Sequence, residues 1–217
     1  MQLDEVSPIA KAILPTLLSL TEPWARDSPF YSKLSRWNYE MSKEAIEPTM
    51  YHTLVARLMQ VLVQDEVEDN STVSVLMRSY KFMDFVYTLF SQSPALIRTN
   101  SDGHNATRWC NDVNTPKLET CPEVISHIMQ ELGRNTDYKP WGEVHEIQFS
   151  HVPFSVNRWL KLLFHRTAPS GGSADTLNSR PFPHGSGFKT SHGPNIRTVM
   201  DLGTGKGYWS LDTVRHT

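Results

Sequence analysis

Hydrophobic residues recur at intervals of three and four along most of the first 135 residues, which is the spacing of amphipathic α-helices. Ser7 followed by Pro8 has the form of a helix N-cap and first helical residue, and Ser28 followed by Pro29 repeats it. A third helix is predicted from Pro48. The apolar positions expected on the buried faces of these helices are Val6, Ile9, Ile13, Leu14, Leu17 and Leu18, then Phe30, Leu34 and Trp37, then Tyr51, Leu54, Val55, Leu58, Met59 and Leu62.

The strongest helix start in this half lies at Thr120. Thr120 can cap a helix whose first turn holds Pro122, and Glu123 stands at the spacing of a capping box. Val124, Ile125, Ile128, Met129 and Leu132 follow on one face. Gly133 is then predicted to end the helix in the left-handed conformation.

Two other stretches of this half are less regular. Residues 73–90 are apolar and favour a helix, although a strand stays possible because of Phe82, Phe85, Val86 and Tyr87. Residues 100–114 are rich in Asn, Asp and Gly and are predicted to form a loop.

The pattern changes after Asn135. A break is expected at Lys139–Gly142, where Pro140 interrupts the chain, and residues 168–187 are predicted to be a long loop because Pro, Gly and Ser dominate them. The elements expected around these breaks are a strand over 146–149, an amphipathic segment over 156–164 with Arg158, Lys161 and Arg166, and strands over 196–202 and 207–211 joined by a turn at 203–206.

Composition excludes some classes of partner. The chain has 217 residues, of which 39% are hydrophobic, and a formal net charge of −2 at neutral pH, so no basic excess points to nucleic acid. No apolar run approaches the roughly 18 residues of a transmembrane helix, so no membrane partner is expected. The N-terminus lacks the basic region of a secretory signal, so export of the protein would need residues upstream of Met1.

The two cysteines, Cys110 and Cys121, allow two interpretations. They can be two buried free thiols, since Cys behaves as a small hydrophobic residue, or a disulfide that closes a short polar loop. Two sequons favour the disulfide, because they are expected in a secreted or lumenal parent protein. These sequons make Asn70 and Asn105 candidate glycosylation sites.

Residues 199–207, Val-Met-Asp-Leu-Gly-Thr-Gly-Lys-Gly, resemble the S-adenosylmethionine-binding loop of Rossmann-like methyltransferases. The alternative is therefore a methyltransferase remnant that ends in its cofactor loop. A helix should follow such a loop, but residues 208–211, Tyr-Trp-Ser-Leu, are a poor helix start and a good strand. A hairpin turn is the favoured interpretation, and no cofactor is expected.

Other candidate chemistry is weaker. Ser186, between Gly185 and Gly187, lacks the spacing of a nucleophile elbow. The nine histidines include no pair spaced by four residues and have no Cys-x-x-Cys partner, so no metal site is predicted. His145 and His192 are instead expected to be hydrogen-bonded structural residues, and the same zinc search considered His151, His165 and His184.

Four short segments occur in order along the chain. The N-terminal segment has Gln2, Asp4 and Ser7, and residues 141–145 are Trp-Gly-Glu-Val-His. Residues 171–178 have the form Gly-Gly-x-x-x-Thr-x-Asn, and residues 193–202 have the form Gly-Pro-Asn-x-Arg-x-x-x-Asp-Leu. In this order the segments resemble the penicillin amidase family of N-terminal-nucleophile hydrolases, which cleave linear amides. The first resembles a helical segment of the family and the second its Trp-Gly-x-x-His segment, and Asn195 replaces a Ser of the family's last pattern. The loop from Cys110 to Cys121 also resembles a Cys-bearing loop of some members.

The resemblance implies an α+β fold: a fragment of the family's α-β-β-α sandwich, with residues 1–135 mainly helical and residues 136–217 rich in loops and strands of the same domain. It places the nucleophilic Ser and the oxyanion-binding Asn outside this chain, so no catalytic residue is assigned within it. After Leu211 the chain departs from the Gly-Gln-Ser-Gly continuation of the family, which suggests truncation.

On this interpretation the chain is part of an amide hydrolase and inactive alone. Its partners would be the remaining chain or subunit of the amidase and a small N-acyl amide, such as a penicillin or an acyl-homoserine lactone. A non-catalytic interaction module with a helical body is a further alternative. The amidase fragment, unlike that module, is expected to expose apolar surface and unpaired strand edges.

Overall fold

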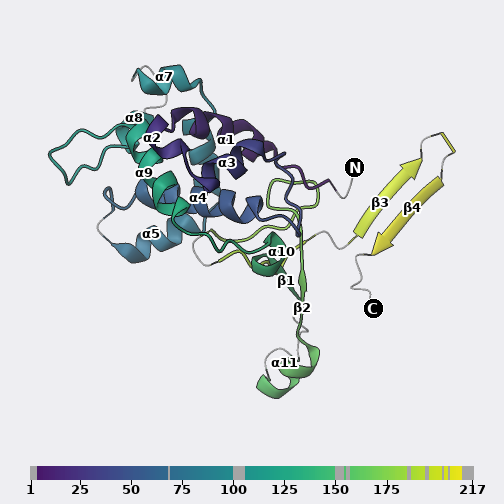
Figure 1. Cartoon of the computed structure of the whole chain (residues 1–217). Helices are drawn as coiled ribbons and strands as arrows, with labels where there is room; N and C mark the ends of the chain where they lie inside the picture. The colour runs from purple at the N-terminus through teal and green to yellow at the C-terminus, as the bar shows by residue number, and fades with distance from the viewer. Residues whose placement is uncertain are drawn as a thin grey trace.

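The computed structural model of the protein describes residues 4–67, 69–99, 106–149, 154, 157–184, 187–193, 196–201, 203–204 and 206–211. In these ranges the chain has an α+β structure in which helices predominate and the strands form two separate two-stranded sheets. Figure 1 shows a helical body, an arm below it that ends in α11, and a β3–β4 hairpin that stands to one side.

The helical body confirms the helix starts expected at Ser7 and Ser28. Each serine is an N-cap whose side chain accepts a hydrogen bond from a backbone N–H three residues later. The third predicted helix begins at Glu47, one residue before Pro48. The helices of the body are α1 (Pro8–Leu20), α2 (Pro23–Arg26), α3 (Pro29–Arg36), α4 (Glu47–Val61), α5 (Asn70–Met77), α6 (Tyr80–Phe90), α7 (Pro94–Arg98), α8 (Ala106–Trp109) and α9 (Cys121–Gly133).

The hydrophobic core lies where α1, α3, α4, α6 and α9 pack together. It contains most of the apolar positions predicted for the first three helices, and Ile13, Leu14 and Leu17 of α1 are fully buried. Val6 is an exception and is exposed, because it precedes α1 and lies in an isolated β-bridge with Glu40.

Residues 73–90 form two helices, so the strand alternative for this segment was wrong. Asp69 ends the acidic connection and caps α5, accepting hydrogen bonds from the backbone N–H groups of Ser71 and Thr72. The predicted candidate Asn70 is the first residue of α5 and is exposed, and its glycosylation stays a prediction. Asn105 lies outside the described residues.

The capping box of α9 is present as predicted, with Thr120 and Glu123 each bonded to the backbone of the other. The role predicted for Gly133 was wrong. Gly133 is the last helical residue, and Arg134 after it keeps a right-handed helical conformation. A Cβ atom at Gly133 would lie 3.2 Å from the Cβ of Ser28, so the close approach of α3 accounts for this glycine.

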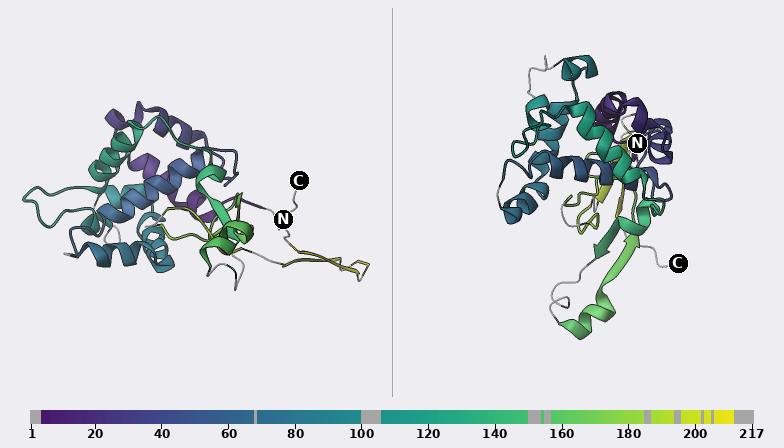
Figure 2. Two further views of the ribbon diagram at one scale, coloured as in Figure 1. Left: turned by 90° about the horizontal axis from the view of Figure 1, so that it is seen from below. Right: turned by 60° about the vertical axis from the view of Figure 1, so that its left-hand side comes forward.

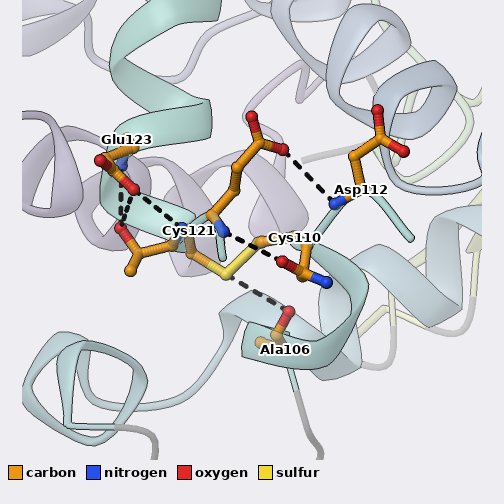
Figure 3. Close-up of a disulfide and its surroundings, with 8 residues drawn as sticks. Ala106, Cys110, Asp112, Cys121 and Glu123 are labelled. Carbon is orange, nitrogen blue, oxygen red and sulfur yellow. Dashed lines mark hydrogen bonds between the residues drawn. A yellow bond between two sulfur atoms is a disulfide. The ribbon is translucent and has the colours of Figure 1, made fainter. Parts of the chain in front are cut away.

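Cys110 and Cys121 form a disulfide, which confirms the second of the two interpretations (Figure 3). Both residues are buried, and the bridge joins the end of α8 to the first residue of α9. The closed loop is also held by Glu119, whose backbone N–H donates to the side chain of Asn111 at 3.0 Å.

The last third of the chain is thinner and extends away from the body (Figures 1 and 2). The strand expected at 146–149 is present, and it pairs antiparallel with a strand over residues 166–169, whose last two residues fall in the predicted long loop. The elements are α10 (Trp141–Val144), β1 (Glu146–Phe149), α11 (Arg158–Phe164), β2 (Arg166–Pro169), β3 (Ile196–Asp201) and β4 (Lys206–Leu211).

The hairpin expected at the C-terminal end is also present, with β3 and β4 antiparallel and Asp201 opposite Lys206. A strand therefore follows the glycine-rich turn, where a cofactor-binding loop would need a helix. The methyltransferase alternative is wrong for this reason. None of the described helices is long and apolar enough to cross a bilayer.

Candidate functional site

Three of the motif segments meet at one end of the helical body. The backbone N–H of Asn178 donates to the carbonyl of Asp4 at 2.9 Å, so the 171–178 loop pairs with the N-terminal segment. The backbone N–H of Ser170, the residue just before this loop, donates to the carbonyl of His145 at 3.0 Å. This bond joins the start of the loop to the Trp-Gly-x-x-His segment. Residues separated by more than 170 positions thus form one junction.

The two glycines of this loop are there because neighbouring atoms leave no room for side chains. Gly172 has φ of +79°, and a Cβ atom there would lie 2.1 Å from the carbonyl oxygen of Asn178. A Cβ atom at Gly171 would lie 2.3 Å from a carboxylate oxygen of Glu5. The loop can therefore approach both its own return and the N-terminal segment.

Asp175, in the middle of the loop, binds the N-terminus of α1. One carboxylate oxygen accepts from the Ser7 hydroxyl at 2.5 Å and from the backbone N–H of Ile9 at 3.1 Å. The other oxygen accepts from the Ser173 hydroxyl at 2.5 Å. A negative charge at this position is favourable because the N-terminal end of a helix carries partial positive charge.

Glu5 and Asn178 make the second side-chain link of the junction. The amide of Asn178 donates to a carboxylate oxygen of Glu5 at 2.8 Å. Burial raises the pKa of Glu5 above its ordinary value, opposed by the hydrogen bond from Asn178 and supported by the charges of Glu40 and Glu44.

Trp141 lies at the centre of an aromatic cluster beside this junction. Its side chain is fully buried, and its indole N–H donates to the carbonyl of Gly172 at 3.0 Å. The ring of His145 stacks on it with centroids 4.5 Å apart, and the ring of His52 stacks on it at 4.9 Å. We call this group the aromatic–histidine cluster; its members are His52, Trp141, His145, Phe182, His184 and Phe188.

Burial keeps the histidines of the cluster neutral. It lowers the pKa of His145 and of His184 to about 4, and it holds the pKa of His52 well below the ordinary value. Nδ1 of His145 lies 2.5 Å from the carbonyl oxygen of Phe188, so this nitrogen carries the proton and donates. The hydrogen-bonding role predicted for His145 fits this contact.

An open, mainly apolar hollow of about 680 Å³ adjoins the junction. Its lining includes Ile9, Met83 and Pro181 together with the carboxylates of Asp84 and Asp175. His192 lies at this hollow and within 3.0 Å of the Ser191 hydroxyl. The hollow can receive an apolar group. A hydroxyl beside an imidazole, as in Ser191 and His192, is the arrangement of a nucleophile and base pair, but Ser191 is exposed and does not line the hollow.

The remaining candidates do not gather here. His165 lies between α11 and β2, in the arm, and is not one of the residues of the junction. His151, Ser186 and Asn195 are outside the described residues. Across the described part of the chain, no three His, Cys, Asp or Glu side chains are placed to hold a metal ion.

Sequence reasoning missed Glu5 and His52 as parts of the site and left the role of Asp175 unassigned. Asp175 stands inside the quoted 171–178 motif, but its partners Ser7 and Ile9 are 168 and 166 residues away. No local pattern signals such a contact. His52 lies on a helix face whose hydrophobic periodicity predicts burial, so the pattern gives no sign that a polar residue there belongs to a site.

A model of the penicillin amidase family matches residues 1–213. The chain belongs to this family. A curated relative is an acyl-homoserine lactone acylase, QuiP, of Pseudomonas syringae pv. syringae strain B728a, with 26% identity over 109 residues. That match covers 46% of this chain and 13% of the acylase, so the matched part spans about an eighth of that relative's length.

Proposed function

We propose that this chain is one part of a hydrolase that cleaves the carbon–nitrogen bond of linear N-acyl amides. The observation that carries the proposal is the penicillin amidase family match, which extends over residues 1–213. The similarity to an acyl-homoserine lactone acylase supports an N-acyl amide of the acyl-homoserine lactone or penicillin type as the substrate class.

The role proposed for the chain is to support the active site, with the chemistry performed by the rest of the enzyme. In an N-terminal-nucleophile hydrolase a terminal hydroxyl attacks the amide carbonyl and its own amino group acts as base. We place that nucleophile, and the groups that stabilise the oxyanion, in the remaining chain or subunit. Residues 1–135 and 136–217 would then form the helical and strand-rich portions of one α-β-β-α domain.

The junction suits such a supporting role. The hydrogen bonds made by Asp175, Glu5 and Trp141 connect distant parts of this chain to one another. Their hydroxyl, amide and backbone partners are all on this chain. A frame that fixes its own loops in this way can position neighbouring groups closely, which is what amide hydrolysis requires of the surroundings of a nucleophile.

The first test is a hydrolysis assay on the purified 217-residue chain with a chromogenic N-acyl anilide and an N-acyl-homoserine lactone. We expect no turnover above the buffer rate. Turnover that is lost when a single serine is replaced would contradict the supporting role, because the nucleophile would then lie in this chain.

The second test concerns the larger enzyme and is independent of the first. Sequencing the transcript on both sides of this reading frame should reveal an in-frame segment that begins with the nucleophilic serine upstream and a Gly-Gln-Ser-Gly continuation downstream. A transcript that encodes only Met1 to Thr217 would overturn the proposed assembly and leave family membership as ancestry alone.

A further inference from the structure

The aromatic–histidine cluster holds several imidazole nitrogens without hydrogen-bond partners. Both ring nitrogens of His52, and Nε2 of His145 and of His184, are buried and have no partner among the described residues. His52 and His145 are almost completely inaccessible, whereas His184 as a residue is half-buried although its Nε2 is shielded. A buried unpaired nitrogen costs free energy, so this concentration calls for an explanation.

The cluster joins parts of the chain that are far apart in sequence. His52 comes from α4 of the body, and Trp141 and His145 come from α10 and its C-cap. Phe182, His184 and Phe188 come from the segment that returns from the 171–178 loop; we call its described residues, 180–184 and 187–190, the returning segment. The ring of Phe182 lies 4.8 Å from that of His52 and 5.2 Å from that of His145.

The contacts of the returning segment depend on neutral imidazoles. A proton added to His52 would place a cation among rings that offer it no hydrogen bond, and the ring of His184 lies only 5.7 Å away. Two cations at that separation in a water-poor site repel each other strongly. Stacking on Trp141 would offset part of this cost for His145 and His52. Burial is the largest cause that lowers the pKa of both histidines.

The charged groups around the cluster do not offset the free-energy cost of protonating its buried histidines. Asp175 favours the cation of His184, but its carboxylate already accepts from Ser7, Ile9 and Ser173. Arg180 disfavours the cation of His145. Tyr51, whose ring lies 5.0 Å from that of His52, has a buried hydroxyl without a partner among the described residues and bears no charge.

We propose that the aromatic–histidine cluster is an acid-sensitive latch. While His52, His145 and His184 are neutral, the latch holds the returning segment on α4 and α10. Protonation of these imidazoles releases the segment and exposes the Trp141 face beneath it. The helical body stays folded because the returning segment contributes only Phe182, and Phe188 packed against it, to a hydrophobic core otherwise built from residues 9–144.

The direction of the pH response follows from the lowered pKa values. In the released state the cluster histidines titrate near their ordinary pKa of 6.5, whereas burial in the closed state lowers the pKa of His145 and of His184 to about 4. Well above pH 6.5 the histidines are neutral in both states and the latch does not respond to pH. As the pH falls from 6.5 towards 4 the released state binds more protons, so release becomes progressively more favourable.

The test is hydrogen exchange of the purified chain, read by mass spectrometry at pH 7.5 and pH 4.5 with rates corrected for the intrinsic effect of pH. We expect peptides that contain the returning segment to lose protection by tenfold or more at pH 4.5. Peptides from α1 and α9 should keep their protection.

Three variants make the test specific. His52→Phe and His184→Leu remove protonation sites within the cluster and should each reduce the pH effect on the returning segment by at least threefold. His127→Gln is the matched control. This histidine is exposed and contacts Trp24 outside the cluster with ring centroids 5.2 Å apart, and its loss should leave the effect unchanged.

Two results would overturn the proposal. If α1 and α9 lose protection together with the returning segment, acid unfolds the whole chain and the cluster is not a latch. If the His184→Leu variant, whose partly exposed site tolerates substitution better than that of His52, keeps the full pH effect, the cluster histidines do not control release.

Discussion

At the scale of single residues, two glycines with positive φ make it possible to measure separately how a steric clash and how backbone strain lower stability when a side chain is added. Gly172 has φ of +79° and lies against the carbonyl of Asn178, while Gly187 has φ of +92° and would have nothing within 4 Å of an added Cβ. Both positions disfavour any residue with a side chain. Only Gly172 also carries a contact that a methyl group would break.

We expect Gly172→Ala to destabilise the chain by about 3 kcal/mol and Gly187→Ala, its matched control, by about 1 kcal/mol. The larger loss arises because the methyl group would clash with the carbonyl of Asn178 at the other end of the loop. Moving residue 172 to relieve this clash would weaken the hydrogen bond from Trp141 to its carbonyl. Urea unfolding followed by far-UV circular dichroism measures both. Equal losses for the two variants would mean that the close approach at Gly172 is not required.

Side chains at this scale also explain why the junction escaped prediction. The junction depends on polar residues in short or irregular segments, namely Glu5, Asp175 and Asn178. Each of them forms its hydrogen bond with a partner that the fold brings from the other end of the chain. Glycines and hydrophobic residues reveal local demands on the backbone. A long-range hydrogen bond leaves no periodic trace in the sequence.

At the scale of elements, local chemistry decided most boundaries. The starts of α1, α3 and α9 follow from Ser7, Ser28 and Thr120, because a capping side chain satisfies an N–H that lacks a partner within the helix. The predictions that failed depended on tertiary packing. Gly133 stays in α9 because α3 approaches it, and the aromatic residues of α6 pack as a helix face where their intrinsic preference would allow a strand.

The disulfide is the covalent link between α8 and α9, and its removal tests how far α9 depends on it. We expect reduction, or the double variant Cys110→Ser/Cys121→Ser, to lower the free energy of unfolding by about 3 kcal/mol, because an open loop gains conformational freedom in the unfolded chain. Helix content should be retained in the native state, since the capping box at Thr120 remains.

Urea unfolding with and without a reducing agent measures this loss. The double variant is its own control, because a reducing agent should not change its unfolding midpoint. A wild-type midpoint that is the same in both conditions would show that the bridge adds nothing to stability and that the packing of Cys110 and Cys121 as buried side chains is sufficient.

At the scale of the whole molecule, the uneven distribution of apolar surface matters most. The helical body buries most of its large apolar side chains, although Val75 of α5 is 67% exposed. The short helix α11 lies at the end of the arm (Figure 1), and it exposes Trp159 by 76% and Leu163 by 64%. Arg158 and Lys161 occupy the opposite side of this short helix by their spacing. An exposed apolar face of this kind matches the expectation for a part of a larger enzyme and not for a self-sufficient module.

The solution behaviour of α11 therefore tests the assembly proposed for this chain. If its apolar face is normally covered by the rest of an amidase, the isolated chain should self-associate at tens of micromolar through that face, because contact between two such faces removes apolar area from water. Trp159→Ser/Leu163→Ser should restore a monomer in sedimentation velocity. Leu118→Ser, which removes a leucine that is even more exposed than Leu163 (74%) from the disulfide loop, should leave association unchanged. A wild-type chain that stays monomeric at these concentrations would favour an independent module, since no surface would then need a cover.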